Sequence, residues 1–480
     1  MKGLFIFLLA LLSGMESLAQ SISFQFDTAQ VFQDADVGAM TFGDIDNDGD
    51  QDLLITGKGG PVLTTLYEND GSGNFTEITG LPFINVYGGA VEFADVDGDN
   101  DLDLIITGST SSPLNTINLY LNDGVGGYSV ATNTPFEAVA FGNIDVADID
   151  DDGDQDLLIT GLTISGTAIT KLYRNDGSAM FTELNGQPFE ALWSSAVEFL
   201  DIDNDTDLDL LMCGTNSNDV PLTLLYSNNG AGAFTLIADT PFDHIDQGDI
   251  AYADCDNDGD TDILLCGKND QQQLIAKLYL NNGMGEYSFF PGTPFPGTLI
   301  GASSFADFDN DGDFDVLHVG TGPGGLADNS IIANVYENTG SNNFILADSL
   351  IGAYFASTAI ADVNGDNKLD VVIAGTTTGS PVRATRLYTN TSIFSGITVQ
   401  QPDDHHFQIF PNPTNRVIQI RSAEFLNAKI AIFNTLGNLV YSGDFTGINQ
   451  QIIVDLADGI YFLTISYKDR VFTQKLILEK

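Results

Sequence analysis

The feature that most constrains this chain of 480 residues is a nine-residue pattern of alternating aspartates that recurs seven times. The seven copies begin at Asp44, Asp95, Asp148, Asp201, Asp254, Asp307 and Asp362, so that neighbouring copies are 51 to 55 residues apart. A repeat of this length suffices for one four-stranded sheet, and repeated units that cannot bury their faces alone must stack on one another. The chain is therefore expected to fold as an array of seven similar units.

Residues 88–136 show the pattern of strands within one unit. Alternating apolar residues before the aspartates, and the apolar run 104–106 after them, predict a hairpin whose turn is the acidic loop. A third strand is expected over 117–121, and Asn122-Asp123-Gly124 is a tight-turn signal that leads into a fourth strand. The sequence predicts an all-β fold in which such four-stranded antiparallel units are the blades of a seven-bladed β-propeller.

The two ends of the repeat array predict how the propeller is closed. The seventh repeat stops near Asn390 without a fourth strand, whereas residues 22–32 precede the first repeat and resemble the fourth strand at 75–83. We expect this N-terminal strand to complete the last blade, because closure removes sheet edges that would otherwise be exposed.

The aspartate loops have the composition of calcium sites. In the fullest loop, 44–52, carboxylates at positions 1, 3, 5 and 9 and the backbone carbonyl at position 7 offer the hard oxygen ligands that Ca²⁺ prefers. His and Cys are missing from these positions, which disfavours zinc and copper. Glycine at position 6 permits a positive φ. Because ionised carboxylates this close repel one another, we expect up to seven structural Ca²⁺ ions and a lower melting temperature after chelation.

The candidate metal-site residues comprise the acidic or amide side chains of the seven loops and the lysine in the last one. They are Asp44, Asp46, Asp48, Asp50 and Asp52; Asp95, Asp97, Asp99, Asp101 and Asp103; Asp148, Asp150, Asp152, Asp154 and Asp156; Asp201, Asp203, Asp205, Asp207 and Asp209; Asp254, Asp256, Asp258, Asp260 and Asp262; Asp307, Asp309, Asp311, Asp313 and Asp315; and Asp362, Asn364, Asp366, Lys368 and Asp370.

Differences between the loops predict different affinities. Thr206 occupies position 6 of the loop 201–209, and a β-branched residue fits a positive φ poorly, so this loop should bind most weakly or be remodelled. Asn100 and Asn367 hold position 6 in two other loops and tolerate left-handed geometry. Lys368 stands at position 7, where only the backbone carbonyl is expected to coordinate.

Ligand recognition is expected on the face opposite the aspartate loops. The residue eight positions before each loop varies while its surroundings repeat, as recognition residues on a scaffold often do. Tyr87, Trp193 and Tyr354 occupy this position and could stack on sugar rings or anchor a protein partner; packing between blades is the alternative. His244 is a further ligand-binding candidate.

The net charge of −51, from 67 acidic and 16 basic residues, disfavours nucleic acid as a partner, because phosphate contacts need clustered Lys and Arg. About half of the acidic residues lie in the seven loops, so divalent cations are the natural partners. The three cysteines are too few for a disulfide framework, and unpaired structural thiols are expected, with a bridge between blades as the alternative.

The two ends of the chain predict export. Residues 1–19 combine Lys2, an apolar run and the small residues Ser17 and Ala19, which is typical of a secretory signal peptide; the run is too short for a stable transmembrane span. Residues 20–394 form the predicted propeller and 395–404 a linker. Alternating apolar positions in 405–480 predict a small C-terminal β-sandwich.

Two families share these motifs. Phe42-Gly43, Phe141-Gly142-Asn143 and the aspartate loops resemble the FG-GAP and VCBS repeats of integrin-α-like propellers, a resemblance that implies seven calcium-binding blades with ligands bound on the opposite face. Phe410-Pro411-Asn412-Pro413 and the final strand pattern resemble the type A C-terminal sorting domain of type IX secretion. That resemblance implies contact with the secretion machinery and a secreted or surface-exposed protein of a Gram-negative bacterium.

These features favour a non-enzymatic, calcium-binding recognition or adhesion module for a glycan or an extracellular protein, expected to be monomeric. The alternative is a secreted polysaccharide-degrading enzyme, since propellers also carry catalytic sites. Against it, the four histidines form no recognisable constellation with a nucleophile, and the aspartates are assigned to metal.

Overall fold

The computed structural model describes residues 22–112, 114–323, 330–378, 382–392, 407–410, 416–434, 439–454, 456, 459–467 and 470–478. The chain divides into two compact units between Phe394 and Ser395. The described residues contain no helix, and hence no helix long and apolar enough to cross a membrane. The predicted signal peptide and the predicted linker lie outside the described residues.

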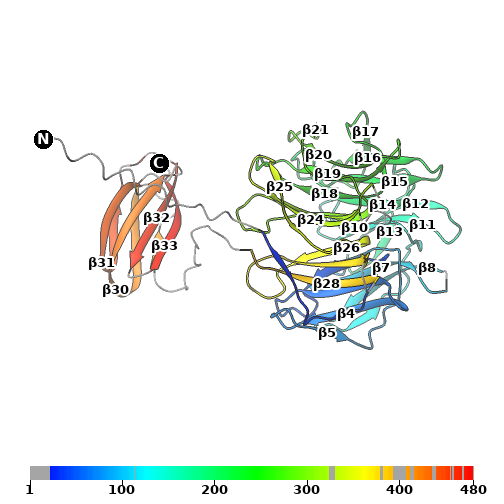
Figure 1. Ribbon diagram of the computed structural model, residues 1–480, viewed down its shortest axis with the longest axis horizontal. Coiled ribbons are helices and arrows are strands. Elements are labelled where there is room, and N and C mark those ends of the chain that lie inside the picture. Colours follow the sequence, from blue (N-terminus) through cyan, green and yellow to red (C-terminus); the bar gives the residue numbers. More distant parts are fainter. Residues whose placement is uncertain are drawn as a thin grey trace. The chain divides into compact units, whose positions relative to one another are not determined.

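The N-terminal unit consists of seven antiparallel sheets of four strands each, which we number blades 1 to 7 in chain order (Figure 1). In blades 1 to 6 the strands follow one another along the chain. Blade 1 contains β2 (Met40–Gly43), β3 (Asp52–Lys58), β4 (Val62–Asn69) and β5 (Phe75–Ile78); blade 2 contains β6 (Val91–Ala94), β7 (Asp103–Ser109), β8 (Asn115–Asn122) and β9 (Tyr128–Val130); blade 3 contains β10 (Ile144–Ala147), β11 (Asp156–Leu162), β12 (Ala168–Asn175) and β13 (Phe181–Glu183).

The other four blades repeat this order, except that blade 7 takes its fourth strand from the N-terminus. Blade 4 contains β14 (Leu192–Leu200), β15 (Asp209–Asn216), β16 (Pro221–Ser227) and β17 (Thr235–Ile237); blade 5 contains β18 (Ile245–Ala253), β19 (Asp262–Asn269), β20 (Leu274–Leu280) and β21 (Ser288–Phe290); blade 6 contains β22 (Leu299–Ala306), β23 (Asp315–Thr321), β24 (Ile331–Asn338) and β25 (Phe344–Ser349); blade 7 contains β26 (Tyr354–Ala361), β27 (Asp370–Thr376), β28 (Arg383–Asn390) and β1 (Phe24–Phe26).

The N-terminal strand β1 pairs antiparallel with β28, with Phe24 opposite Asn390 and Phe26 opposite Tyr388. The ring of Phe24 packs edge-on against Phe308 of blade 6, with the ring centroids 5.3 Å apart. This strand therefore both completes the last blade and buries an aromatic side chain against its neighbour.

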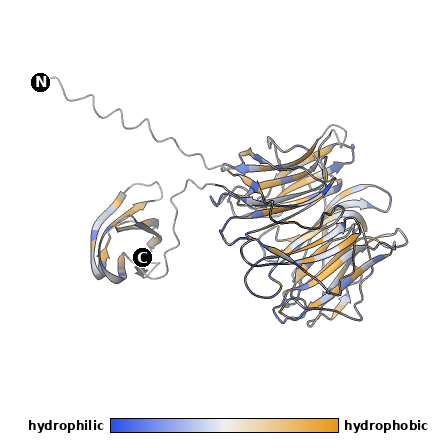
Figure 2. Cartoon of the chain, turned by 60° about the horizontal axis from the view of Figure 1, so that its bottom comes forward, coloured by the Kyte–Doolittle hydropathy of each residue, from blue (hydrophilic) through white to orange (hydrophobic). Residues whose placement is uncertain are grey.

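The core of each blade follows from the second and third strands. The second strand is buried along almost its whole length and is apolar, because neighbouring blades cover both of its faces. Figure 2 shows many hydrophobic strand segments, coloured orange, in the N-terminal unit. The third strand carries a buried tyrosine whose ring packs edge-on against a phenylalanine from the link that leads from the preceding blade into its own. These pairs include Tyr67 with Phe32, Tyr120 with Phe83, Tyr173 with Phe136, Tyr226 with Phe189, Tyr279 with Phe242 and Tyr336 with Phe295.

Blade 6 contains one polar exception to this apolar core. Ser303 and His318 stand opposite each other on β22 and β23, where blade 3 has the pair Ile144 and Ile159. The His318 ring is fully buried; Nε2 donates to the Pro296 carbonyl at 2.8 Å, so Nδ1 accepts from the Ser303 hydroxyl at 2.9 Å. Burial lowers the pKa of His318 to about 4.

The three cysteines are unpaired. All three thiols, of Cys213, Cys255 and Cys266, are free and buried, which confirms the expectation of structural thiols. Burial raises the pKa of the Cys213 and Cys266 thiols to about 12, so they are unreactive at neutral pH.

The described strands of the C-terminal unit belong to one five-stranded sheet rather than to two separate sheets. They are β29 (Phe407–Phe410), β30 (Val417–Asn434), β31 (Leu439–Ile453), β32 (Gly459–Tyr467) and β33 (Arg470–Leu478). The sheet is continuous because the last part of β30 pairs with both β31 and β32. A single apolar cluster, which includes Ile430, Phe445 and Leu463, forms the core of this unit.

Deletion of residues 22–32 is expected to lower the melting temperature of the N-terminal unit far more than an ordinary terminal truncation, because blade 7 loses its fourth strand. A milder test is Phe24→Ala, which removes the ring packed on Phe308 and should lower the free energy of unfolding by about 2 kcal/mol or more. Val31→Ala is the control, since Val31 is 84% exposed. Equal melting temperatures for the deletion and the full chain would refute the role of β1.

The His318 pair predicts a defined pH dependence. A histidine with a pKa of about 4 in the folded protein and about 6.5 in the unfolded chain binds more protons when unfolded between these values. Stability should therefore fall as the pH drops through this window, by about 3 kcal/mol in total. The double variant Ser303→Ile/His318→Ile recreates the blade 3 pair and should remove this part of the slope. Denaturant unfolding of both proteins from pH 4 to 7 measures it, and identical slopes would contradict the prediction.

Candidate metal sites and ligand-binding surface

Each aspartate loop connects the first and second strands of a blade and is organised by its own first carboxylate. In the loop 44–52, Asp44 accepts hydrogen bonds from the backbone N–H groups of Asp48 and Gly49 at 3.1 and 3.0 Å. The first aspartates of five other loops accept the corresponding two bonds, whereas Asp201 accepts only the one from the position 6 N–H of Thr206. Hydrogen bonds within the loop thus fold it around the first carboxylate, without any contribution from an ion.

Two residues of each loop have left-handed backbone conformations. In the first loop these are Asn47 at position 4 (φ 61°) and Gly49 at position 6 (φ 95°). Sequence reasoning identified position 6 but missed position 4, although the residues there are all Asn, Asp or Gly, which tolerate this conformation. Thr206 adopts φ 78°, so position 6 keeps the left-handed conformation, although Asp201 accepts only one of the two usual loop hydrogen bonds. Weak ion binding by this loop stays a prediction.

The last carboxylate of each loop is buried. Asp52 is 1% exposed and accepts hydrogen bonds from the backbone N–H groups of Ile45 at 3.0 Å and Asn69 at 2.8 Å. Burial is the main cause that raises its pKa to about 6, and burial raises the pKa of the equivalent Asp315 to about 8. These carboxylates are unfavourable as lone buried anions, so a nearby cation would stabilise the charged form.

The third position leaves oxygen atoms without partners. In five loops the Oδ1 atom at position 3 is buried and has no hydrogen-bond partner among the described residues, at Asp46, Asp97, Asp150, Asp203 and Asp256. Burial, and secondarily the neighbouring aspartates, raise the pKa of each of these carboxyls. Orphaned, mutually repelling oxygens of this kind fit a hard cation.

Carboxylate oxygens of several loops converge closely enough to share one ion, lying within 4.8 Å of one another. The groups are Asp44, Asp46 and Asp48; Asp95, Asp97 and Asp99; Asp148, Asp150 and Asp156; Asp201, Asp203 and Asp209; and Asp254, Asp256 and Asp262. These clusters combine positions 1 and 3 with either position 5 or position 9, all of which the sequence predicted as ligands. They could each hold a metal ion.

The side chain at position 7 has a different role. Asp101, Asp260 and Asp313 each accept a hydrogen bond from the position 4 asparagine of the preceding loop, at 2.8, 2.7 and 2.6 Å respectively. Lys368, at position 7 of the last loop, donates from Nζ to the Ser392 carbonyl at 2.9 Å. These side chains join neighbouring parts of the fold, and coordination by the backbone carbonyl of position 7 stays a prediction.

An asparagine at the end of each third strand links the loops of neighbouring blades. Its backbone N–H binds the buried carboxylate of its own blade, and its side-chain Nδ2 donates to the position 2 carbonyl of the preceding loop at 2.7 to 2.9 Å. These side-chain bonds are Asn69 to Val363, Asn122 to Ile45, Asn175 to Val96, Asn228 to Ile149, Asn281 to Ile202, Asn338 to Cys255 and Asn390 to Phe308. The bond from Asn69 connects blade 1 to blade 7.

On the opposite face, one residue of each blade surrounds a cavity of about 430 Å³, which we call the channel mouth. All seven have left-handed backbone conformations with φ between 47° and 59°: Val37, Gly88, Phe141, Ser194, Gln247, Ile300 and Phe355. Backbone hydrogen bonds join several of them in sequence, from Gly88 to Val37, from Phe141 to Gly88 and from Ser194 to Phe141. Left-handed Val, Ile and Phe are strained, and such strain is concentrated at functional sites.

The predicted ligand-binding residues have different positions relative to this mouth. Trp193 lines it, and Phe141, which is 42% exposed, adds a second aromatic ring. The rings of Tyr87 and Tyr354 lie beside the mouth, 6.2 Å from Phe141 and 4.2 Å from Phe355 respectively. His244 is exposed in the link before β18, and its Nδ1 accepts from the Thr223 backbone N–H.

Two other residues at the predicted position pack between blades. Asp36 pairs with Arg383 of blade 7 at 2.8 Å, whereas Asp246 pairs with Lys268 of its own blade at 3.4 Å and accepts a hydrogen bond from the Thr215 hydroxyl of blade 4 at 3.4 Å. The position eight residues before each loop therefore serves blade packing at some blades and the channel mouth at others. Sequence reasoning missed the residues of the channel mouth, which stand seven positions before each loop, because they share a backbone conformation rather than a residue type.

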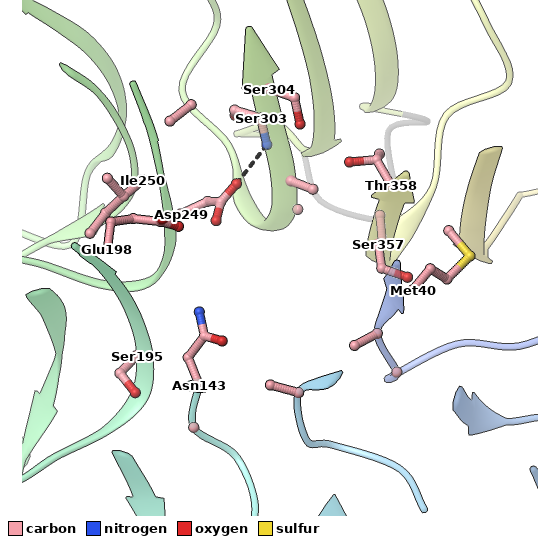
Figure 3. Close-up of a pocket in the computed structure, with 18 of the residues that line it drawn as sticks. Met40, Asn143, Ser195, Glu198, Asp249, Ile250, Ser303, Ser304, Ser357 and Thr358 are labelled. Atoms are coloured by element: carbon pink, nitrogen blue, oxygen red, sulfur yellow. Dashed lines mark hydrogen bonds between the residues drawn. The ribbon is translucent and has the colours of Figure 1, made fainter. Parts of the chain in front are cut away.

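A second cavity of about 500 Å³ lies along the first strands, and acidic side chains reach into it (Figure 3). Glu198 and Asp249 line it. Glu92 and Asp145 are the equivalents of Glu198 in blades 2 and 3, each three residues before its loop. Burial raises the pKa of Glu92 to about 8, of Asp145 to about 7 and of Asp249 to about 6. Sequence reasoning missed these acids, although an acid recurs at this position in three consecutive repeats.

Seven four-stranded blades with a common acidic loop define a repeat protein of the β-propeller class. Four segments match the family described as FG-GAP-like repeat, at residues 44–106, 95–159, 201–265 and 254–318. Residues 408–479 match the family described as secretion system C-terminal sorting domain. The chain therefore contains FG-GAP-like repeats and a type IX sorting domain, and the sorting domain indicates secretion to the cell surface or the extracellular space.

Solved structures give distant likenesses. They include AofleA from Arthrobotrys oligospora, with 7% identity, TM-score 0.38 and coverage of 69% of this chain and 92% of that chain. PorZ of the Porphyromonas gingivalis type IX secretion system has 11% identity, TM-score 0.42 and coverage of 92% and 59%. Rhamnogalacturonan lyase PL11 of Bacillus licheniformis has 14% identity, TM-score 0.44 and coverage of 78% and 75%. These likenesses are too distant to bear on function. A search of curated proteins finds no match.

The left-handed threonine predicts a weak point in the loops. Thr206→Gly should raise the free energy of unfolding by about 1 kcal/mol in calcium buffer, because it relieves a β-branched residue at φ 78°. Gly259→Thr at the same position of blade 5 is the matched reverse change, and a Cβ there meets no atom within 4 Å, so only backbone conformation is affected. Urea unfolding of the two variants measures the effect. A stable Gly259→Thr variant together with an unaltered Thr206→Gly variant would contradict it.

Proposed function

We propose that this protein is a secreted, non-enzymatic recognition module that binds a glycan or a protein at the channel mouth. In this proposal the seven blades close into a propeller and Ca²⁺ fills the aspartate loops as a structural ion. The observation that carries the proposal is the mouth itself, a cavity with Trp193, Phe141 and Phe355 in its wall. Aromatic side chains in a concave site are the usual means of binding sugar rings and of anchoring protein partners.

Contacts between the first and last blades support closure. The Asn69 side chain reaches the Val363 carbonyl at 2.9 Å, and Arg383 pairs with Asp36. The hydrogen bond repeats the one found between other neighbouring blades, as a ring would require. A closed ring also explains why one residue of every blade reaches the same mouth.

Calcium is the ion that best fits the loops. The converging ligand atoms are carboxylate oxygens, and backbone carbonyls are available beside them. Oxygen-rich, irregular sites with several carboxylates favour Ca²⁺ over Mg²⁺, which demands a near-ideal octahedron. The ions would then lie on the face opposite the mouth and would hold blades together rather than contact the ligand.

A glycan-degrading enzyme is the second candidate, and the channel acids are the observation that favours it. Acids with raised pKa values in a cavity are candidate general acids, and paired carboxylates cleave glycosidic bonds. Asp145 and Asp249, however, are hydrogen-bonded to backbone N–H groups of the next blade, at Phe199 and Ser303. They are therefore already used to join blades, and we favour binding without turnover.

A glycan and extracellular-protein array tests the proposal. The full mature chain in calcium buffer should bind a ligand that Trp193→Ala weakens by about tenfold or more. Phe289→Ala is the control, because Phe289 is an exposed aromatic residue of the outer strand β21. Bound glycans are then tested for turnover. If the chain releases products from a bound glycan and Glu198→Gln abolishes this release, the protein is a glycan-degrading enzyme rather than a binding module. If Trp193→Ala leaves ligand binding unchanged, the ligand does not bind at the channel mouth.

A further inference from the structure

The channel mouth and the acidic cavity are continuous. Six residues line both of them, and none has a side chain longer than that of serine: Gly38, Gly89, Gly142, Ser195, Gly301 and Ala356. The wall between the two cavities thus presents mainly backbone. A slender group that enters through the mouth can therefore reach the acids beneath.

The acids in the channel lack positive partners. No described residue that lines either cavity is Lys, Arg or His. Glu198 is enclosed by the protein except where it lines the cavity, and it has no hydrogen bond or ion pair to another described residue. Its pKa is raised well above the ordinary value by burial first, and then by Asp145, Asp249 and Glu92. The four acids therefore lie close enough to repel one another.

The basic residues nearest the mouth are already engaged. Arg383 pairs with Asp36 and Lys268 with Asp246. The Lys58 Nζ lies 3.9 Å from the centre of the Tyr87 ring. Aromatic rings at the mouth above acids without positive partners are complementary to a cation on an apolar stem. A bound cation stabilises the charged form of an acid whose pKa is raised by burial, whereas a neutral sugar does not.

We propose that the channel mouth receives the lysine side chain of a partner protein, with the ammonium at Glu198 and the aliphatic stem against Trp193 and Phe141. This inference rests on the proposed function and names the chemistry of its ligand. Lysine fits better than arginine, because Glu198 and Asp249 line the acidic cavity from two different blades and an ammonium has three donors that can point in different directions. The planar guanidinium is instead suited to one carboxylate at a time.

Calorimetry with two short peptides tests this inference. The probes are acetyl-Gly-Gly-Lys-Gly-Gly-amide and the same peptide with an acetylated lysine Nε, titrated into the full mature chain with the aspartate loops saturated by calcium. The first peptide should bind, and acetylation should weaken binding by about tenfold or more, because it removes a charge-assisted hydrogen bond. Equal binding of both peptides, or of neither, would overturn the inference.

Variants locate the site. Glu198→Gln should weaken binding of the lysine peptide by about tenfold or more. Asp249→Asn, which changes the other acid of the same cavity, provides a second variant if the first fails to fold. Asp239→Asn is the matched control, because it removes one exposed charge outside both cavities at a left-handed position that Asn tolerates. An equal loss of peptide binding in the control would show general electrostatic attraction instead of a site. Competition of calcium with the peptide would show a site for an inorganic cation instead. Either result would overturn the inference. If binding of an array ligand requires Trp193 but not Glu198, the proposed function stands and only the assignment of a lysine side chain as the ligand is refuted.

Discussion

The buried carboxylate at the end of each aspartate loop is the interaction on which the rest of this structure depends. It accepts one backbone N–H from its own loop and one from the asparagine that follows the third strand, so loop and blade are held at one point. The same asparagine donates to the preceding loop. The candidate metal sites and the contacts between neighbouring blades therefore share one network. A buried anion of this kind is favourable only when its charge is compensated, which explains why loops so rich in aspartate can form part of a stable fold.

This network assigns separate roles to the two ends of each first strand. At one end the aspartates organise a loop, and at the other a left-handed residue opens the channel mouth. The glycine that follows is required there because a Cβ on Gly142 would lie 2.1 Å from the Thr160 carbonyl oxygen. Close approach of the first and second strands thus fixes the backbone, while the side chain of the preceding residue remains free to vary among Val, Phe, Ser, Gln and Ile. A rigid frame with variable side chains is well suited to recognition.

Much of this could be predicted from the sequence because it is local and repeated. Alternating aspartates, the apolar second strand and the Asn-Asp-Gly turn specify a blade wherever they occur. The place of the N-terminal strand could be predicted because the seventh repeat lacks a fourth strand of its own. The channel acids could not be placed in the same way, because Glu92 and Glu198 resemble ordinary exposed strand residues until the blades are arranged around a common axis. The sequence assigned the side chains at positions 1, 3, 5 and 9 and only the backbone carbonyl at position 7 as candidate ligands. The hydrogen bond that Asp101 accepts from Asn47 could not be predicted, because it joins the loops of two blades. The partnership of Ser303 with His318 required the register of two strands.

The central claim is that ion binding and adhesion between blades are one system, and calcium-dependent melting of Asn175→Ala tests it most directly. Asn175 is fully buried and joins the loop of blade 3 to that of blade 2, whereas Asn185 is exposed and serves as the control. The account predicts that calcium raises the melting temperature of the full chain and of Asn185→Ala by the same amount, and raises that of Asn175→Ala by less. An equal rise in all three proteins, or no response to calcium in any of them, would contradict it.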